Sequence, residues 1–356
     1  MGSETIHVAI DATAIASGDT GVAHYTKQHL AHLAQHPEVV PIPFAIGRGM
    51  HEAPGLRRVR TPLRVVHRSW QLLRWPTADA LVGPVDLVHS VDMVPPPTSR
   101  PLVMTIHDTL PLEIPHLYGR RYIQIARAGL ARAREAKVIC ATCEATADRI
   151  SEVTGVDRSR IIVASPGRRP ELGEMEPLVP GPYILAVGSI TPRKGFHILV
   201  EAVAQLGDDA PPLIVAGPDG WRSEEVRAKA TELRLGARVR FLGRISDEHL
   251  ERLFRHATVF CHPSVAEGFG IPCLEALGFG VPVVAADIPP VREMGAGTIE
   301  LVEPNDPESL AQGLRRVLVD HELATRMAST GRERAATYTW ARMTDRIVGA
   351  YHRALS

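Results

Sequence analysis

Two glutamates eight residues apart, Glu267 and Glu275, stand on either side of a glycine-rich turn. The turn reads Gly268-Phe269-Gly270, so its backbone can adopt positive φ and bring N–H groups close to a ligand. A glutamate in this setting can accept both hydrogens of a ribose diol, which is the chemistry of a nucleotide-sugar site. The alternative is structural, because a helix macrodipole alone favours a glutamate in the first turn and glycines are common in loops.

The sequence around this pair predicts the elements that must hold it. An apolar run at 259–262 predicts a buried strand that ends in the loop carrying Glu267. Pro272 suits the first helical position, which would place Glu275 in the first turn of that helix. Residues 280–286 then predict a helix end and a further buried strand. Loops that enter a helix at the carboxyl end of a parallel strand are where open α/β sheets bind ligands.

Another loop with suitable groups for a ligand spans residues 187–196. It follows a predicted strand, opens a helix, and combines Gly188 with the cations Arg193 and Lys194. A glycine loop, positive charge and a helix N-terminus together suit a diphosphate. Outside that context, two adjacent cations are more often a solvated surface pair.

Two features of the N-terminal half could face a substrate. His107 ends an apolar run and is followed by Asp108, so it is either a packed, hydrogen-bonded residue or an active-site group. Gly18 and Gly21 lie in a loop between the first predicted strand and a helix, where the backbone could approach an anion or an acceptor. Because glycine loops are common, the structural interpretation stays open for this loop.

The segment 262–287 resembles the retaining GT-B glycosyltransferases of family four, the glycosyl transferases group 1, and bacterial mannosyltransferases among them. The resemblance spans nearly the whole chain, and its specific motifs lie within 188–287. It implies an α/β fold of the GT-B type, with two Rossmann-like domains facing an interdomain cleft. The C-terminal domain would hold the nucleotide sugar and the N-terminal domain the acceptor, and closure would exclude water.

The resemblance also implies roles for single residues. Glu267 would orient the sugar hydroxyls together with the backbone of 268–270, and Glu275 would bind the ribose. His107 would lie close to the transferred sugar and its phosphate, so His107 and Glu267 are the candidates for catalysis. The residues that would hold the donor are Gly18, Gly21, Gly188, Arg193, Lys194, Gly268, Phe269, Gly270 and Glu275.

The chain departs from the family pattern at two places. Many members carry an arginine directly after the first glycine of the phosphate loop, where this chain has Ser189, so Arg193 would supply the second charge beside Lys194. The N-terminal loop of the family is often Gly-Gly-rich, whereas Asp19 and Thr20 separate the two glycines here. In the family, cations neutralise the diphosphate without a metal, so neither a metal nor a cofactor is predicted.

The predicted function is a metal-independent hexosyltransferase of EC class 2.4. It would move a hexose, with GDP-mannose the favoured donor, from a nucleoside-diphosphate sugar to a hydroxyl of a glycan, glycolipid or natural-product acceptor. No carboxylate pair has the signature of a double displacement, so front-face attack assisted by the leaving phosphate is the better mechanism. Two alternatives stay open, a GT-B nucleotide-sugar epimerase and a catalytically silent sugar-nucleotide-binding protein.

Composition and charge limit the class of protein. Lys plus Arg equals Asp plus Glu at 40 each, which argues against a dedicated nucleic-acid binder. The sequence leads straight into a strand, so neither a signal peptide nor a membrane span is predicted and the chain is expected in the cytoplasm. Residues 53–78 hold six arginines, two tryptophans and no acid. The stretch from Arg57 to Trp75 would contact the inner membrane face, bind an anionic acceptor, or form an arginine-rich face over the core.

Strand-like runs, among them those at 102–106, 138–141 and 213–216, alternate with helical patterns such as the one at 21–35 along the whole chain. This alternation indicates parallel sheets covered by helices. The four cysteines fall in apolar runs or separate elements and are predicted to be packing residues. His29, His32 and His36 share a face of one predicted helix, but a four-coordinate metal site needs further ligands. The predicted domains are an N-terminal Rossmann-like domain at 1–170, a linker at 171–182, a nucleotide-sugar-binding domain at 183–337 and a helix at 338–356 that returns to the first domain.

Overall fold

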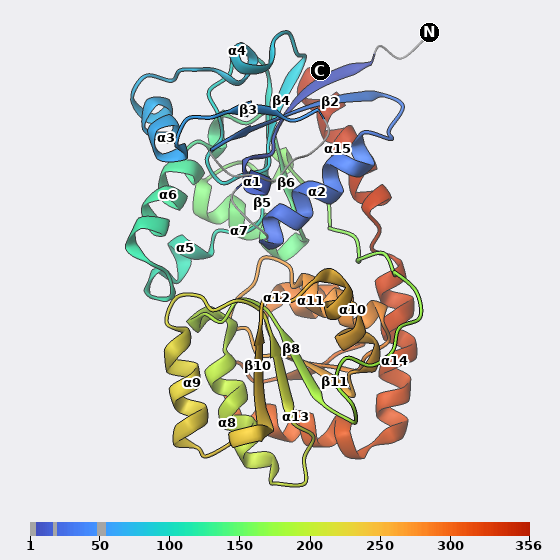
Figure 1. The fold of residues 1–356 in the computed structure, drawn as a ribbon. Helices are drawn as coiled ribbons and strands as arrows, with labels where there is room; N and C mark the ends of the chain where they lie inside the picture. The colour runs from blue at the N-terminus through green and yellow to red at the C-terminus, as the bar shows by residue number, and fades with distance from the viewer. Residues whose placement is uncertain (1–4, 17–19, 48–54) are drawn as a thin grey trace. The chain divides into compact units, whose positions relative to one another are not determined.

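The computed structural model describes residues 5–16, 20–47 and 55–356. The chain forms two compact units, each built on one parallel sheet (Figure 1). The backbone N–H of Arg168 donates to the carbonyl oxygen of Tyr338 over 3.2 Å, and these two residues are the ends of the second unit. Unit 1 contains the described residues up to Gly167 together with Thr339–Ser356, and unit 2 is the continuous segment Arg168–Tyr338.

Unit 1 carries a seven-stranded sheet in the order β3-β2-β1-β4-β5-β6-β7, with every neighbouring pair parallel. The direction of the chain through this sheet reverses between β1 and β4, because β2 lies on one side of β1 and β4 on the other. Such a reversal opens a crevice at the carboxyl ends of the two strands. The strands are β1 Ile6–Asp11, β2 Val39–Ile46, β3 Arg57–Val59, β4 Leu87–Ser90, β5 Leu102–Ile106, β6 Val138–Ala141 and β7 Ile161–Val163.

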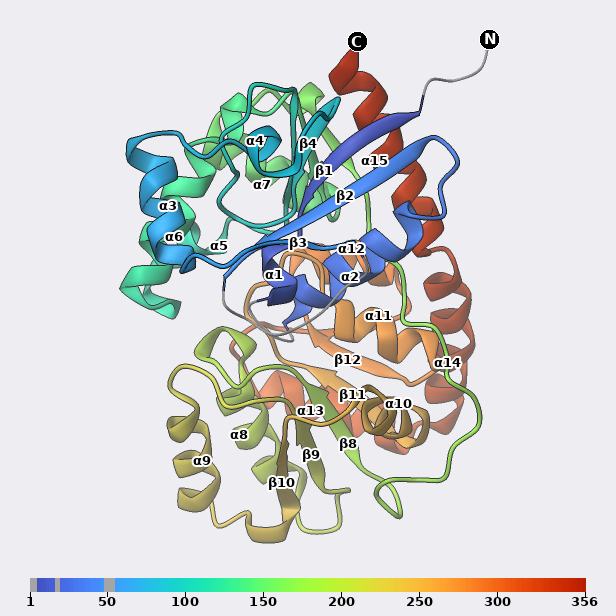
Figure 2. The same cartoon turned by 45° about the horizontal axis from the view of Figure 1, so that its top comes forward.

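Helices cover the sheet of unit 1, and the last helix of the chain is one of them (Figure 2). In α15, the buried side chains Trp340, Met343, Ile347 and Tyr351 recur at helical spacing, so one stripe of the helix packs against β4, β5 and β6 beside α2. The helices are α1 Thr13–Ala16, α2 Gly21–Leu33, α3 Leu63–Leu72, α4 Ala78–Val82, α5 Leu110–Glu113, α6 Arg120–Leu130, α7 Glu144–Thr154 and α15 Trp340–Leu355.

Unit 2 carries a six-stranded parallel sheet in the order β10-β9-β8-β11-β12-β13, with its own reversal between β8 and β11. The strands are β8 Ile184–Val187, β9 Leu213–Ala216, β10 Val239–Gly243, β11 Val259–His262, β12 Val283–Ala286 and β13 Glu300–Val302. The helices are α8 Phe196–Leu206, α9 Ser223–Glu232, α10 Asp247–His256, α11 Ile271–Gly278, α12 Pro289–Gly295, α13 Pro307–Val319 and α14 His321–Ala336. The segment 168–182 contains neither helix nor strand and belongs to this unit.

Several predicted strands are confirmed, whereas the first long helix is shorter than predicted. The strands predicted at 102–106, 138–141, 213–216 and 259–262 have the same bounds in the structure. The helix predicted over 21–35 ends at Leu33, because a proline at position 37 disfavours helical backbone before it, so His36 lies outside the helix. The four cysteines are buried and free, as predicted.

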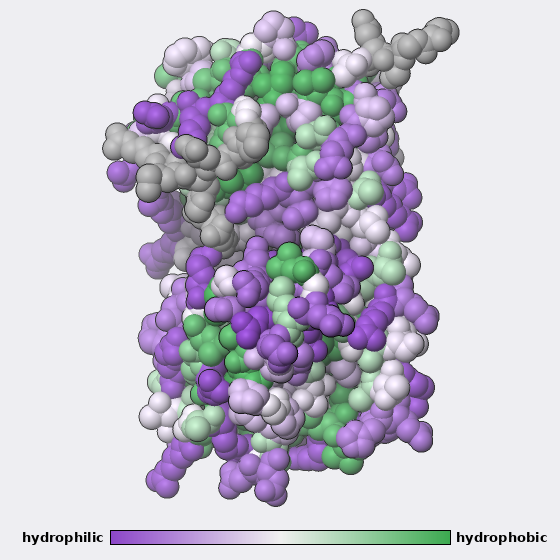
Figure 3. All heavy atoms as spheres, turned by 45° about the vertical axis from the view of Figure 1, so that its right-hand side comes forward, coloured by the Kyte–Doolittle hydropathy of each residue, from purple (hydrophilic) through white to green (hydrophobic). Residues whose placement is uncertain are grey.

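The surface shown in Figure 3 is mostly hydrophilic, with apolar side chains in separate patches. No helix in the described part of the chain is both long enough and apolar enough to cross a lipid bilayer. The apolar residues are instead concentrated between each sheet and its helices, where strands such as β5 and β12 are buried along their whole length.

Candidate functional site

Two loops of unit 2 meet at the reversal between β8 and β11. The first follows β8 and contains a 3₁₀ turn at Pro192–Lys194, and the second follows β11 and carries Glu267. The N–H of Val265 donates to the carbonyl oxygen of Arg193 over 2.9 Å, and Arg193 Nη1 donates to the carbonyl oxygen of Ala266 over 2.6 Å. The cation loop and the glutamate loop, which the sequence presents separately, therefore form one site at the place where an open sheet binds ligands.

Gly195 makes this close meeting of the loops possible. Its φ is +66°, and a Cβ atom built at this position would lie 2.0 Å from the carbonyl oxygen of Pro263. No side chain fits there, so the backbone of the first loop can lie directly on the second. Helix α8 begins at the next residue, Phe196, with its N-terminal N–H groups at the same edge.

Glu267 binds both cations of the first loop. Arg193 Nη1 lies 2.8 Å from Glu267 Oε2, Lys194 Nζ lies 2.5 Å from Oε1, and His262 Nε2 lies 3.3 Å from Oε1. The side chains are 8% exposed for Glu267, 18% for Arg193 and 14% for Lys194. Burial by itself raises the pKa of Glu267, but the Arg193 and Lys194 charges outweigh it and hold that pKa well below its ordinary value of 4.5. Glu267 is therefore an ionised group at neutral pH.

The cluster brings two cations, Arg193 and Lys194, to one place that is largely removed from water. A charge in such surroundings interacts more strongly with an anion than the same charge at the surface. Together with the N-terminus of α8, the cluster can therefore stabilise a phosphate or diphosphate.

A third loop, the turn at 216–221 after β9, packs against the cation loop that follows β8. Gly188 adopts φ +151°, and its N–H donates to the carbonyl oxygen of Ala216 over 2.9 Å. A Cβ atom at Gly217 would lie 2.0 Å from the carbonyl oxygen of Gly188, and one at Gly220 would lie 2.7 Å from the hydroxyl of Ser189. The glycines of the 216–221 turn are therefore needed for close packing, a role that their spacing alone does not reveal.

The turn between the two glutamates uses only one of its two glycines for a positive φ. Gly270 adopts φ +100°, but Gly268 does not lie in the left-handed region, so one positive φ is enough to make the turn. The ring of Phe269 is 5% exposed and packs edge-on against Tyr338 at a centroid distance of 5.7 Å. The ring of Phe269 is therefore a packing group within unit 2.

Glu275 lies deeper in its helix than predicted. Helix α11 begins at Ile271, which puts Pro272 at the second position and Glu275 at the fifth, beyond the first turn. At this position the helix N-terminus contributes little to stabilising the carboxylate of Glu275. The carboxylate is instead paired with a cation, with Arg169 Nε 3.1 Å from Oε1. Glu275 is 4% exposed, and burial raises its pKa although Arg169 acts in the opposite direction.

His107 and Gly21 belong to unit 1, so the structure does not place them relative to the glutamates. The ring of His107 packs edge-on against Tyr25 at 4.7 Å, and its Nε2 is buried with no hydrogen-bond partner among the described residues. Burial lowers the pKa of His107 to about 4, so the imidazole is neutral at pH 7. Gly21 begins α2, with Thr20 as its N-cap. Gly18 lies outside the described residues.

The sequence did not point to Asp11, which ends β1 at the reversal of the unit 1 sheet. It is 1% exposed, its Oδ1 accepts the N–H of Thr13 over 3.0 Å, and burial with a further contribution from Asp92 raises its pKa to about 7. A carboxyl that titrates near neutrality at the carboxyl end of a central strand is a candidate functional group. An aspartate after an apolar run is the signal that could have found it.

Family models match both halves of the chain. Residues 20–172 match "Glycosyltransferase Family 4", and residues 176–334 match "Glycosyl transferases group 1". D-inositol 3-phosphate glycosyltransferase of Nocardia farcinica is 29% identical over 402 residues, which cover 99% of this chain and 85% of that protein. O-antigen chain mannosyltransferase B of Escherichia coli is 30% identical over 172 residues, which cover 48% of this chain and 45% of that protein.

Solved structures share the fold. Sucrose-phosphate synthase of Thermosynechococcus elongatus superimposes with a TM-score of 0.78 at 20% identity, covering 98% of both chains. Anabaena Alr3699/HepE, solved in complex with UDP-glucose, gives a TM-score of 0.73 at 18% identity over 98% of this chain and 99% of that one. With both halves matched by family models and two parallel Rossmann-like sheets in place, the chain is a retaining GT-B glycosyltransferase of family 4, an enzyme that transfers a sugar from a nucleotide sugar.

Proposed function

We propose that this enzyme transfers a hexose, with retention, from a nucleoside-diphosphate sugar to a hydroxyl of a glycan, glycolipid or natural-product acceptor. The observation that carries the proposal is the buried cluster of Arg193, Lys194 and Glu267 beside the N-terminus of α8. Its two cations suit the diphosphate that leaves when the glycosidic bond of the donor breaks. Glu267, held by both cations, would orient the sugar hydroxyls, and Glu275 would accept the ribose diol.

The division of labour in the reaction follows from charge. Lys194 and Arg193 would stabilise the departing diphosphate, and its phosphate oxygen would take the proton of the attacking acceptor hydroxyl on the same face of the sugar. His107 is neutral at pH 7 because burial lowers its pKa to about 4. We therefore assign His107 a hydrogen bond to a sugar hydroxyl rather than the neutralisation of a phosphate.

For the donor we propose a mannosyl nucleotide, GDP-mannose, as the first candidate. It is supported by the partial similarity to a protein named a mannosyltransferase. The complex of Alr3699/HepE with UDP-glucose makes that compound the first competitor. Thermal unfolding with GDP, UDP, dTDP and ADP sugars separates them, because a ligand that binds the folded state at 100 times its Kd stabilises it by about 2.7 kcal/mol. A rise in Tm with UDP-glucose and none with GDP-mannose would overturn the mannosyl assignment.

A product assay tests the transferase against its alternatives. The donor that raises Tm is incubated alone and with two acceptors, D-inositol 3-phosphate, taken from the name of a relative, and a mannose-terminated oligosaccharide. Transfer is expected only when an acceptor is present, with the anomeric configuration of the donor kept in the product by NMR. A changed nucleotide sugar formed without acceptor would instead identify an epimerase, and binding without any turnover would identify a silent binding protein.

We further propose that α3 and the residues after it touch an anionic membrane surface. Leu72, Leu73 and Trp75 are 70%, 72% and 64% exposed, and Arg64 and Arg68 lie on the same surface as the leucines. Exposed apolar side chains with arginines around them suit the headgroup region of an anionic bilayer.

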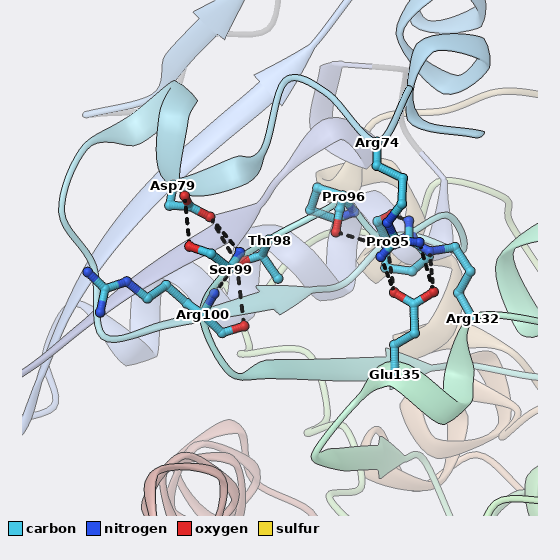
Figure 4. Close-up of polar contacts among 9 residues, drawn as sticks. All are labelled: Arg74, Asp79, Pro95, Pro96, Thr98, Ser99, Arg100, Arg132 and Glu135. Carbon is cyan, nitrogen blue, oxygen red and sulfur yellow. Dashed lines mark hydrogen bonds and ion pairs between the residues drawn. The ribbon is translucent and has the colours of Figure 1, made fainter. Parts of the chain in front are cut away.

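Not every arginine of this basic stretch is available for such a contact. Arg74 donates to both oxygens of Glu135, at 3.1 and 2.8 Å, and Arg132 bonds the same carboxylate (Figure 4). Arg57 bonds the carbonyl oxygen of Val82. These arginines are already bonded within unit 1, so we restrict the proposed membrane contact to α3 and its flanks.

Sedimentation with vesicles tests the membrane contact. Replacing Leu72 and Leu73 by serine is expected to lower the fraction bound to phosphatidylglycerol vesicles at least tenfold, because each leucine contributes about 1.5 to 3 kcal/mol when fully buried. Val319→Ser is the control, since Val319 is 73% exposed on α13 beside Arg315 and Arg316 but lies in unit 2. Equal binding of wild type and the double variant, or equal binding to neutral phosphatidylcholine vesicles, would refute the contact.

A further inference from the structure

The segment 169–177, at the start of unit 2, is hydrogen-bonded along helix α10. Residues 169–177, which we call the strap, are bonded by successive side chains on one face of that helix. Glu251 of α10 is fully buried and accepts the strap N–H of Leu172 at both of its oxygens over 2.9 Å. The other bonds are from Arg252 Nε to the carbonyl oxygen of Glu176 at 2.8 Å, from Arg255 Nη2 to Glu171 Oε2 at 3.0 Å, and between His256 Nε2 and the carbonyl oxygen of Met175 at 2.8 Å.

The strap brings one arginine onto the predicted ribose ligand. Arg169 Nε lies 3.1 Å from Glu275 Oε1, and Arg169 Nη1 lies 2.8 Å from Asp247 Oδ1 at the start of α10. The side chains are 11% exposed for Arg169 and 4% for Glu275, whereas Asp247 is 75% exposed. A buried ion pair of this kind fixes both partners, because breaking it would leave a buried charge without a counter-ion.

We propose that Arg169 is a positioning residue for the donor, which holds Glu275 in place to accept the ribose hydroxyls. The inference rests on the proposed role of Glu275 in ribose binding. Arg169 occupies Oε1 only, and Oε2 makes no hydrogen bond with any residue that the structure describes. A carboxylate oxygen has two acceptor sites, so Oε2 alone can receive both hydrogens of a ribose diol.

Arg169 also controls the charge of Glu275. Burial raises the pKa of Glu275, the Arg169 charge lowers it, and Asp247 raises it, with the net result above the ordinary value. Without the guanidinium, burial and Asp247 act unopposed and the pKa rises further. A protonated carboxyl loses acceptor capacity, so ribose binding should weaken as pH falls, and it should do so at a higher pH in a variant that lacks Arg169.

An arginine suits this position better than a lysine. The guanidinium reaches Glu275 through Nε and Asp247 through Nη1, so two edges of one planar group hold two carboxylates. A lysine keeps a positive charge but has a single ammonium on a flexible stem. Arg169→Lys keeps the positive charge that lowers the pKa of Glu275 but loses the two-sided guanidinium contact that orients its carboxylate. The variant therefore separates these two effects.

Calorimetric titration with UDP and GDP and with their 2′,3′-dideoxy counterparts measures the contribution of the diol directly. Whichever of UDP and GDP binds wild type more tightly is compared with its own dideoxy counterpart. The dideoxy compound is expected to have a Kd about tenfold higher. In Arg169→Met that difference should be lost. In Glu275→Gln it should shrink, because a neutral amide oxygen accepts a hydrogen bond more weakly than a carboxylate, and Arg169→Lys should keep part of it. Between pH 8 and 5.5, the affinity of Arg169→Met should begin to fall at a higher pH than that of wild type.

The control breaks the strap at another place. Arg252→Met removes two strap bonds, to the carbonyl oxygens of Glu176 and Pro177, but does not touch Glu275, so its diol contribution and pH profile should match those of wild type. If Arg169→Met keeps the full diol contribution while Glu275→Gln reduces it, the positioning role of Arg169 is refuted and the ribose role of Glu275 stands. If Glu275→Gln also keeps it, the ribose role itself falls. Equal losses in Arg252→Met and Arg169→Met would show that the strap acts as a whole and that Arg169 has no special part.

Discussion

Replacing Lys194 by methionine is expected to lower the turnover number by about 100- to 1000-fold while the protein stays folded, the scale found when one stabilising group is removed from a developing charge. Methionine has a similar length and no charge, and Glu267 keeps Arg193 as its partner at 2.8 Å. What is lost is a cation two residues before the start of α8, which we propose stabilises the leaving diphosphate. The measurement is the initial rate at saturating donor and acceptor, together with the Tm of both proteins.

Lys229→Met provides the matched control. Lys229 lies on α9, is 33% exposed, and pairs with Glu232 at 3.1 Å and Glu201 at 3.9 Å. Ion pairs of this exposure contribute at most about 1 kcal/mol, so this variant should keep wild-type turnover and nearly wild-type Tm. If Lys194→Met keeps turnover within fivefold of wild type, Lys194 does not stabilise the leaving group. A Tm loss above about 10 °C with turnover preserved in the folded fraction would make Lys194 a stability residue.

Gly195→Ala is expected to destabilise unit 2 by about 3 to 5 kcal/mol, near the upper end of single substitutions, and to abolish donor binding. The new methyl group would lie 2.0 Å from the carbonyl oxygen of Pro263, so the cation loop would have to move away from the glutamate loop. Arg193 and Lys194 could then no longer reach Glu267 together. Urea unfolding followed by tryptophan fluorescence measures the first effect, and titration with the nucleoside diphosphate measures the second.

Gly236→Ala separates the clash from the backbone conformation. Gly236 adopts φ +49°, close to the +66° of Gly195, but a Cβ atom there would meet nothing within 4 Å. This variant should therefore cost only the left-handed conformation, about 1 to 2 kcal/mol, and should bind donor normally. If the two alanine variants are equally stable, the loops are not in the contact described and the geometry of the site is wrong.

The strands of the two sheets could be located from sequence because parallel strands are covered on both faces. In β5 and β11, every residue is buried, so an unbroken apolar run marks both ends of the strand. The helices that follow them, α5 and α11, each carry a proline in their first two positions, which is a local signal for a helix start. The alternation of the two patterns then indicates the fold class.

β2 could not be located in this way because it contains two prolines, at positions 41 and 43. Ile6 N donates to the carbonyl oxygen of Glu38, and Ala12 N donates to that of Phe44, so the even-numbered residues of β2 face β1. The proline nitrogens face the other way, where β3 pairs only with residues 44–46. The two prolines therefore remove no hydrogen bond from the sheet, because β3 is too short to reach them. The length of β3 cannot be read from the sequence of β2, so the strand could not be predicted from its own residues.

The site was predicted as a set of loops but not as a set of contacts. Both loops at the reversal of the unit 2 sheet carry their own signals, namely glycines, cations and a proline near a helix start. The partners of the glutamates carry none, because Arg193 lies 74 residues from Glu267 and Arg169 lies 106 residues from Glu275. The order of the strands in the sheet determines which distant loops meet. A local sequence pattern does not reveal that order, so these contacts could not be predicted.

The bond between Arg168 and Tyr338 gives the second unit the topology of an insert, with both ends at one point. A segment whose ends meet can be replaced by another with the same end-to-end spacing without stretching the host chain, which is why such positions tolerate domain insertion. Residues 168–338 are continuous in sequence, so a single crossover at each end would exchange the whole segment between related genes. The donor-binding groups that we assign to unit 2, among them Lys194 and Glu275, would then be inherited together as one segment.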